Sequence, residues 1–256
     1  LARLAAMWVG AKPDHLAVAN GAAELIKILG NQFVRRLTIP TPSFNEYEEV
    51  ITPDGLNRFP LEPGTFELDI DAFAESALRW GSDTAVVVTP NNPTAVSVPP
   101  GALIRLARRL EAGNCRLIVD ESFIEFSKAG VAGSVEEMVD SVANLVVIKS
   151  MSKVFGIAGL RIGYVLSADR EFIKTVRASL PIWNVNGLAE EFLRTVGRYR
   201  NEFSESCDLT RSSCAELYAE LLALPGIVPV EPDANFVLCK LVGDSVTGPQ
   251  IARRMY

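Results

Sequence analysis

The segment that decides the fold is an apolar run, Leu145-Val146-Val147-Ile148, followed shortly by Ser150-Met151-Ser152-Lys153-Val154-Phe155-Gly156-Ile157-Ala158-Gly159-Leu160-Arg161-Ile162-Gly163-Tyr164. The apolar run is continuous rather than alternating, which is typical of a strand buried on both faces of a sheet. Ligands of α/β proteins bind at the carboxyl ends of such strands. Lys153 follows that end and is therefore a candidate functional residue, although an isolated lysine is more often a solvated surface residue.

Similar apolar runs recur on both sides of this segment and alternate with helical stretches between residue 17 and about residue 166. This alternation predicts an α/β fold with a mainly parallel sheet flanked by helices. Helical spacing is found over residues 22–29 and 101–110, where the charged set Arg105, Arg108, Arg109 and Glu111 has the spacing of a solvated face. The expected strands are residues 37–39, 85–88, 116–119, 145–148 and 161–166.

The pattern changes beyond residue 170. It predicts helices over about 170–180 and 187–222, a strand over 235–238 and a further helix that starts at 248 and runs to 256. We therefore expect two domains: a large domain over residues 1–188 and a smaller, partial α+β domain over residues 189–256.

Composition narrows the classes of function. The 256 residues carry a formal net charge of −6, which disfavours a nucleic-acid partner. The four cysteines lack CxxC spacing and His15 is the single histidine, so we expect no metal site. We expect the cysteines to be free thiols and the protein to lie in a reducing, cytoplasmic compartment. The apolar opening run is too short to span a bilayer, so no membrane partner is expected.

Four more landmarks accompany the lysine segment. Asp120 follows the expected strand 116–119, and Asn92 lies in Thr89-Pro90-Asn91-Asn92-Pro93-Thr94 after the strand 85–88. A small-residue turn opens a helix at Gly21-Ala22-Ala23, where free backbone N–H groups can hold phosphate. Phe44 follows the strand 37–39. Each landmark taken singly also has an ordinary structural explanation. The aspartate can be a helix N-cap, the Asn-Pro segment a turn, the small residues a helix start and the phenylalanine a core aromatic.

In order and spacing the five landmarks resemble the fold-type I pyridoxal-phosphate enzymes. Within them the sequence is similar to the aminotransferase class I/II group around histidinol-phosphate aminotransferase and threonine-phosphate decarboxylase. The resemblance covers about residues 18–190, and its most specific parts are Ser-x-Ser-Lys with Gly-Leu-Arg after it and Pro-Asn-Asn-Pro-Thr.

The resemblance implies pyridoxal 5'-phosphate as the cofactor and assigns roles to matched positions. Lys153 would form a Schiff base with the cofactor aldehyde and then move protons at the substrate Cα. Asp120 would pair with the pyridinium nitrogen. The remaining matched positions would bind the cofactor: Asn92 at the ring hydroxyl, Phe44 on the ring face, and Gly21, Ala22, Ala23, Ser150, Ser152 and Arg161 around the phosphate.

The sequence also departs from the family pattern. Phe123 stands where these aminotransferases usually have a tyrosine that bonds the ring oxygen, and Ala95 replaces a usual glycine. An N-terminal arm and a carboxylate-gripping arginine, both expected from the family, do not match any part of the chain. Asn184 or Asn186 is a candidate substrate contact, Tyr47 and Tyr164 are expected to be structural, and His15 is expected in a surface turn without a role.

Three functional hypotheses follow. The first is an aminotransferase that exchanges an amino group between a small amino acid, phosphorylated or not, and a 2-oxo acid, in a homodimer. The second is a decarboxylase of a phosphorylated amino acid, favoured by Phe123, since the decarboxylase relatives tolerate phenylalanine there. The third is a non-catalytic domain that keeps the cofactor fold without its substrate half. A Rossmann nucleotide-binding domain is set aside because no Gly-x-Gly-x-x-Gly follows the first strand.

Overall fold

The computed structural model describes residues 1–243 and 247–255, and this part of the chain is built on a seven-stranded sheet. The strand order is β1-β7-β6-β5-β4-β2-β3, and β7 is antiparallel to both of its neighbours while the other pairs are parallel. The predicted α/β class with a mainly parallel sheet is confirmed. The strands are β1 (Leu16–Ala19), β2 (Leu37–Thr41), β3 (Leu56–Pro60), β4 (Thr84–Val88), β5 (Arg116–Asp120), β6 (Leu145–Ser150) and β7 (Gly163–Ser167).

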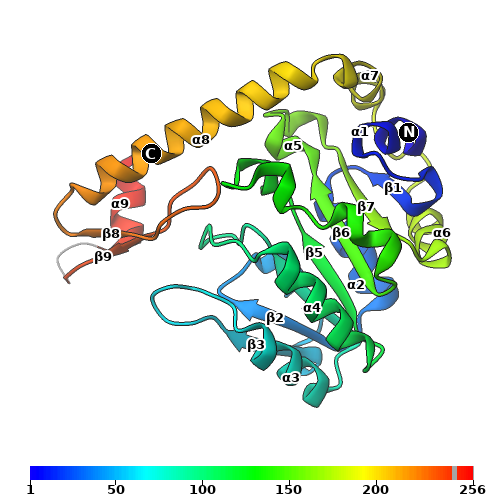
Figure 1. Cartoon of the computed structure of the whole chain (residues 1–256), viewed down its shortest axis with the longest axis horizontal. Helices are drawn as coiled ribbons and strands as arrows, with labels where there is room; N and C mark the ends of the chain where they lie inside the picture. Colours follow the sequence, from blue (N-terminus) through cyan, green and yellow to red (C-terminus); the bar gives the residue numbers. More distant parts are fainter. Residues whose placement is uncertain (244–246, 256) are drawn as a thin grey trace.

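Helices cover both faces of this sheet (Figure 1). Alternate residues of each strand point to opposite faces, so Val86 and Ile118 pack into one core with α2 (Ala22–Phe33) and α6 (Arg170–Ser179). Val87 and Leu117 pack into the other core, against four further helices. Those helices are α1 (Ala2–Val9), α3 (Ile70–Trp80), α4 (Pro100–Glu111) and α7 (Gly187–Thr195).

Short helical turns connect the layers. The α-helical turn α5 (Met151–Val154) follows β6 directly. The 3₁₀ turns are η1 (Pro13–His15), η2 (Asn45–Tyr47), η3 (Pro53–Gly55), η4 (Ile124–Phe126), η5 (Gly130–Gly133), η6 (Glu136–Ser141), η7 (Ala158–Leu160) and η8 (Val196–Arg198).

The C-terminal part leaves the sheet along one long helix, α8 (Arg200–Leu222), drawn in yellow to orange in Figure 1. At its far end β8 (Ile227–Pro229) and β9 (Cys239–Leu241) form an antiparallel pair, followed by α9 (Gly248–Met255). The expected boundary between residues 188 and 189 falls in the first turn of α7, which buries Ala189 and Leu193 in a core of the large sheet. The division into two domains there stays a prediction.

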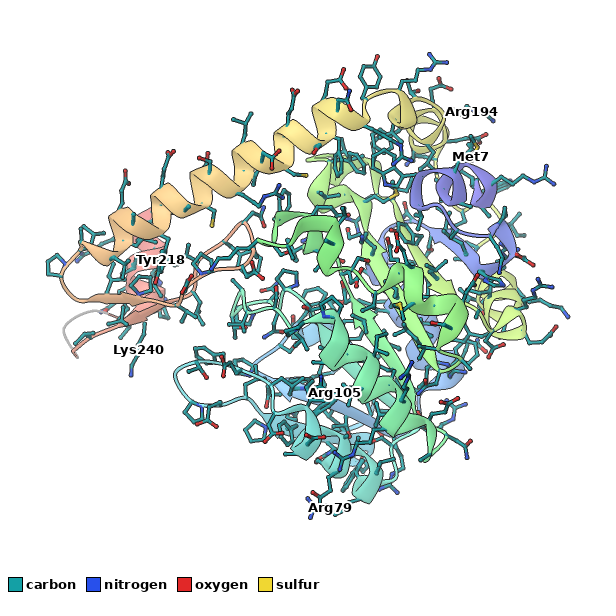
Figure 2. All side chains as sticks on the ribbon, viewed as in Figure 1. Met7, Arg79, Arg105, Arg194, Tyr218 and Lys240 are labelled. Carbon is teal, nitrogen blue, oxygen red and sulfur yellow. The ribbon has the colours of Figure 1, made fainter. Side chains whose placement is uncertain are left out.

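The predicted solvated face of α4 is confirmed, because Arg105, Arg108, Arg109 and Glu111 are all exposed; Figure 2 shows Arg105 on α4 and Arg79 on α3. The predicted helix over 187–222 is interrupted by η8, between α7 and α8. None of the helices in the described ranges is both long enough and apolar enough to cross a bilayer.

Two local expectations are wrong. Residues 235–238 do not form a strand, because this segment is held against the large sheet: Asp233 donates its N–H to the Ala95 carbonyl at 2.7 Å and the Phe236 ring meets Phe123. The hairpin strand is β9 instead. His15 is not a surface residue, since it is 7% exposed and its Nδ1 lies 2.7 Å from an Asp140 carboxylate oxygen.

Candidate active site

Strand direction brings the predicted site residues to one edge of the sheet. The strands β1, β2, β4, β5 and β6 point the same way, so their carboxyl ends meet at that edge, and antiparallel β7 begins there. Gly21 follows β1, Phe44 follows β2, Asn92 follows β4, Asp120 ends β5, Lys153 follows β6 and Arg161 precedes β7. This is the edge at which α/β sheets bind ligands.

Asp120 is a buried carboxylate surrounded by hydrogen-bond donors. It is 3% exposed; its Oδ1 accepts from the Ser122 N–H at 3.0 Å and the Ser122 hydroxyl at 2.6 Å. Its Oδ2 accepts from the Tyr47 hydroxyl at 2.8 Å. Burial raises the pKa of Asp120 above its usual value, while the hydrogen bonds from Ser122 and Tyr47 and the charge of Lys153 oppose that shift.

Tyr47 is a site residue that the sequence reasoning treated as structural. Burial and the neighbouring Asp120 raise the pKa of the Tyr47 phenol well above its ordinary value, so the phenol stays a donor at neutral pH. The one available sequence signal is its spacing: Tyr47 stands three residues after Phe44, on the turn η2 that follows β2. That spacing brings both aromatic rings to the carboxyl edge.

Lys153 lies on the turn α5 and is exposed. Its Nζ is 5.3 Å from the centre of the Phe123 ring, and that ring packs edge-on against Phe236 at 5.1 Å between centroids. The amine therefore faces an apolar wall formed by two aromatic side chains from distant parts of the chain. Phe236 was not predicted as a site residue.

The start of α2 and Arg161 form a cradle suited to phosphate. Gly21 has φ 88° at the N-cap of α2, and a Cβ on Gly21 would lie 2.7 Å from Arg161 Nη2. A Cβ on Gly163 would lie 2.7 Å from the Ala22 nitrogen, so β7 and α2 approach each other closely. The first N–H groups of a helix and a guanidinium both bind phosphate oxygens. Arg161 itself has φ 52°, a backbone conformation that non-glycine residues rarely adopt.

Ser150 and Ser152 lie beside this cradle, and both are buried. The Ser152 hydroxyl accepts from the Ile162 N–H at 3.1 Å. The Ser150 N–H donates to the Ser122 hydroxyl at 3.0 Å. Direct contact of the two serine hydroxyls with a phosphate stays a prediction.

Asn91, the neighbour of the predicted Asn92, links the loops at this edge. Its side-chain nitrogen donates to the Pro42 carbonyl and to the Thr94 hydroxyl, both at 2.9 Å, and its oxygen accepts from Ser43 at 2.8 Å. These bonds tie the loop that carries Phe44 to the loop that carries Asn92. Phe44 and Asn92 are both partly buried at the edge.

The described residues fit the cofactor implied by the resemblance. Asp120 is a buried anion whose hydrogen-bond donors are uncharged, so a protonated ring nitrogen would supply its counter-charge. Arg161 occupies the space that a side chain at position 21 would need. Because Gly21 has no side chain, the backbone N–H groups and the Arg161 guanidinium lie close together and can both bind the phosphate. Lys153 supplies an exposed primary amine.

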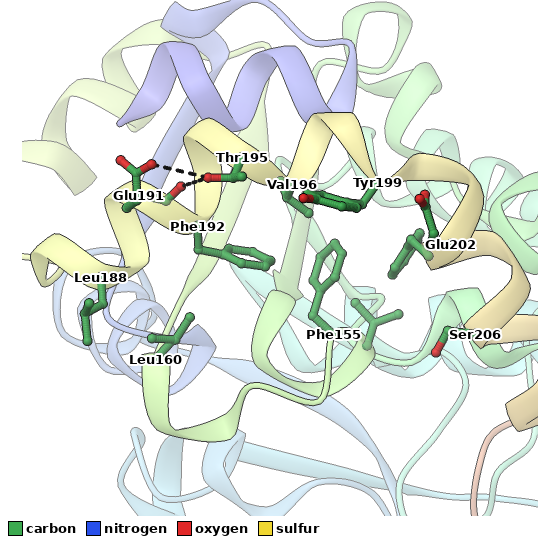
Figure 3. A pocket seen from close by; sticks show the side chains of 12 residues that line it. Phe155, Leu160, Leu188, Glu191, Phe192, Thr195, Val196, Tyr199, Glu202 and Ser206 are labelled. Atoms are coloured by element: carbon green, nitrogen blue, oxygen red, sulfur yellow. Dashed lines mark hydrogen bonds between the residues drawn. The ribbon is translucent and has the colours of Figure 1, made fainter.

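A cavity of about 650 Å³ lies next to the turn α5, since Val154 and Phe155 line it (Figure 3). Phe155, Leu160 and Phe192 form much of its wall, and Glu191 and Glu202 lie on it. Among the described residues that line it there is no lysine or arginine and none of the predicted site residues. This cavity is therefore distinct from the phosphate cradle.

A cluster of buried charges lies on the other side of β5 and β6 from Asp120. Lys149 Nζ is 3.0 Å from Glu125, 3.5 Å from Glu136 and 3.9 Å from Glu121. Burial raises the pKa of Glu121 to about 7, against the opposing charge of Lys149. Tyr164, which bonds Glu136, also belongs to this cluster.

Comparisons with known proteins show to which family the chain belongs. The family model described as aminotransferase class I and II matches residues 1–255. The chain is 43% identical to CMP-5'-(3-aminopropyl)phosphonate synthase of Streptomyces rubellomurinus over 256 residues, all of this chain but 40% of that protein. It is 31% identical to L-serine phosphate decarboxylase of Sulfurospirillum multivorans, over 90% of this chain and 60% of that protein. The chain thus spans between two fifths and three fifths of the length of these two relatives.

The solved histidinol-phosphate aminotransferase of Clostridium acetobutylicum has the same fold, with a TM-score of 0.87 at 24% identity over 99% of this chain and 75% of that one. A further histidinol-phosphate aminotransferase with this fold has been solved in complex with pyridoxal 5'-phosphate. The resemblance drawn from the sequence is confirmed: the chain belongs to the aminotransferase class I and II family, whose cofactor is pyridoxal 5'-phosphate.

Proposed function

We propose that the chain carries the catalytic site of a pyridoxal-phosphate-dependent enzyme that acts on a small amino acid bearing a phosphate or phosphonate. The observation that carries this proposal is the placement of an exposed amine, a buried carboxylate and a guanidinium cradle at one sheet edge, in Lys153, Asp120 and Arg161. The substrate class is supported by the names of two relatives, which specify an aminopropyl phosphonate and a serine phosphate.

When bound, the cofactor supplies a protonated ring that withdraws electrons from the substrate Cα. Asp120 holds the proton at the ring nitrogen, and Tyr47 and Ser122 hold Asp120. Arg161 and the first N–H groups of α2 bind the phosphate and fix the orientation. Lys153 takes and returns the proton at Cα, since its amine is exposed on a turn directly above the strand ends.

Transamination is the first candidate reaction, because the family description is that of aminotransferases. It requires Lys153 to move the Cα proton of the amino donor, and it yields a 2-oxo acid from that donor.

Decarboxylation is a second candidate, favoured by the wall that Phe123 and Phe236 form beside Lys153. An apolar wall removes water from a substrate carboxylate placed against it, and a poorly hydrated carboxylate loses CO₂ more readily. The serine phosphate decarboxylase relative is in line with this reading.

A visible absorption spectrum tests the cofactor and its anchor. We expect the full-length protein to develop an absorbance band with pyridoxal 5'-phosphate that borohydride bleaches, and Lys153→Ala to lack it. Lys174→Ala, at an exposed lysine on α6, is the matched control and keeps the band. A wild-type protein without a band would contradict the proposed function.

A product assay separates the reactions. Incubation with O-phosphoserine or a 2-amino acid whose side chain carries a phosphonate, with and without a 2-oxo acid as amino acceptor, yields a new 2-oxo acid if the protein is an aminotransferase and CO₂ with a primary amine if it is a decarboxylase. If the cofactor binds and neither product forms from a panel of such amino acids, the non-catalytic cofactor-binding hypothesis is favoured instead.

We also propose a homodimer, as the family resemblance implies. Ile182 and Trp183 are 95% and 96% exposed just before α7 and are candidates for its interface. Light scattering of the wild type and of Trp183→Glu tests this, with a dimer expected for the wild type and a shift toward monomer for the variant. A monomeric wild type would count against it.

A further inference from the structure

Ser122 makes a pair of hydrogen bonds that the cofactor chemistry does not by itself require. Its side chain is buried, with 7% of the residue exposed. The hydroxyl donates to Asp120 Oδ1 at 2.6 Å and accepts from the Ser150 N–H at 3.0 Å. One hydroxyl therefore joins the end of β5 to the end of β6.

The second bond reaches the backbone that carries the reactive lysine. Ser150 is the last residue of β6 and the N-cap of α5, three residues before Lys153. An alanine at position 122 would remove the donor to Asp120 and leave the Ser150 N–H, in a buried place, without this acceptor. The two catalytic groups on neighbouring strands are thus connected through a single side chain.

We propose that Ser122 is a positioning residue that fixes the Asp120 carboxylate toward the cofactor ring and ties it to the start of the lysine-bearing turn. This inference rests on the proposed function, because it concerns the same site. It adds a residue whose role the sequence motifs did not assign.

The hydroxyl also affects the charge state of Asp120. Burial raises the pKa of Asp120 and the Ser122 hydroxyl is the strongest of the contacts that lower it. The titratable groups that face Asp120 are Tyr47 on η2 and Lys153 on α5. Both remain in a Ser122→Ala variant, so the loss of the hydroxyl moves the protonation of Asp120 to higher pH.

Cofactor binding measured against pH tests the proposal without an activity assay. The dissociation constant of pyridoxal 5'-phosphate is determined by absorbance titration between pH 5 and pH 8 for full-length wild type, Ser122→Ala and Ser122→Cys. We expect roughly tenfold weaker binding in Ser122→Ala at neutral pH. Binding should fail at low pH, where Asp120 becomes protonated; we call this part of the pH profile the acid limb. In Ser122→Ala the acid limb should lie about one pH unit higher than in the wild type. Ser122→Cys, with a weak donor, should fall between wild type and Ser122→Ala.

Ser82→Ala is the matched control. Ser82 is equally buried and its hydroxyl bonds Thr38 at 2.7 Å, just before the amino end of β4 and so away from the site. If the role of Ser122 were merely structural, its variants would have a lower melting temperature, as we expect for Ser82→Ala, and the pH at which cofactor binding fails would not change. That result in either folded Ser122 variant would overturn the proposal. Failure of the wild type to bind the cofactor at any pH would instead refute the proposed function.

Discussion

Tyr47 is one of the side chains that hold the Asp120 carboxylate in place. Its hydroxyl donates to Asp120 Oδ2, and the raised pKa of the phenol keeps that proton in place at neutral pH. Tyr47→Phe removes a hydrogen bond to a buried charged group, which is worth about 1.5–3 kcal/mol. We expect cofactor affinity to fall by roughly ten- to a hundredfold, measured by titration with pyridoxal 5'-phosphate.

The control for Tyr47 is another buried tyrosine. Tyr164 is 1% exposed and bonds Glu136 on the opposite side of the sheet from Asp120. Tyr164→Phe should lower stability and leave cofactor affinity near the wild-type value. Equal affinity in Tyr47→Phe and wild type would show that Asp120 does not depend on this donor.

Ala95 occupies a backbone position that suits glycine. Its φ is 58° and it is fully buried, in the loop that carries Asn92. The left-handed conformation costs a non-glycine residue about 1–2 kcal/mol, and Ala95→Gly relieves that strain at the expense of chain entropy and one buried methyl group. We expect the free energy of unfolding, measured with urea, to stay level or rise by up to about 1 kcal/mol.

Ala107→Gly is the comparison for Ala95, since Ala107 is equally buried but lies within the helix α4. There the change should lower the free energy of unfolding by about 1 kcal/mol or more. If Ala95→Gly destabilises the protein as much as Ala107→Gly, the strain at position 95 has no energetic consequence.

At the level of elements, the sequence predicts five strands of the large sheet, because continuous apolar runs such as residues 85–88 and 145–148 mark them directly. It does not predict β1 (Leu16–Ala19), which is buried throughout, or β3 (Leu56–Pro60), an edge strand in which only Leu56 is buried. It also wrongly predicts a strand at 235–238, because the apolar side chain of Phe236 packs against Phe123 and does not belong to a sheet.

The candidate site is predictable to a similar extent. Residues next to strand ends, such as Asp120, are found from sequence because parallel topology brings strand ends together. The partners that hold them are not: Tyr47 and Asp120 are far apart in the chain and meet only through the fold. Asn91 lies in the same short motif as Asn92, yet its bonds to Pro42 and Ser43 depend on the packing of two loops.

The contact between α2 and β7 leads to a prediction at this level. A Cβ on Gly163 would lie 2.7 Å from the Ala22 nitrogen and 2.9 Å from the Lys149 carbonyl oxygen, both backbone atoms. Gly163→Ala must therefore push the start of α2 away from β7 and open the phosphate cradle. We expect at least roughly tenfold weaker cofactor binding together with a lower melting temperature.

Gly101→Ala is the matched change for Gly163, because Gly101 lies on α4 and its Cβ would meet no atom within 4 Å. It should leave cofactor binding unchanged and the melting temperature level or higher. Wild-type affinity in Gly163→Ala would show that the close approach of α2 and β7 is not needed for the cradle.

For the whole molecule, the charge cluster around Lys149 connects parts of the chain that are far apart in sequence. Glu121 directly follows β5, Glu125 lies on η4 and Glu136 on η6, and all three surround Lys149 of β6. The Glu125 carbonyl also accepts from Arg211 on α8. The long C-terminal helix is thereby attached to the strand ends that form the site.

This cluster makes the stability of the protein depend on pH. The pKa of Glu121 is about 7 in the folded protein, above the ordinary value of 4.5, because burial disfavours its charge more than Lys149 favours it. A carboxyl whose pKa is raised by folding stabilises the protein fully below its unfolded pKa, and that contribution is lost as pH rises through the folded pKa. The free energy of unfolding should therefore fall between about pH 4.5 and pH 7, by at most about 3 kcal/mol from this group.

Glu121→Gln isolates that contribution. Glutamine keeps the size of the side chain and an oxygen that can accept from the Val135 N–H, but it does not titrate. Urea unfolding between pH 5 and pH 8 should show a flatter pH dependence in Glu121→Gln than in the wild type. Glu171→Gln, at an exposed residue of α6 whose side chain is 82% accessible, should keep the wild-type slope. Identical slopes in wild type and Glu121→Gln would mean that Glu121 is already ionised in the folded protein at pH 5, with Lys149 compensating its burial in full.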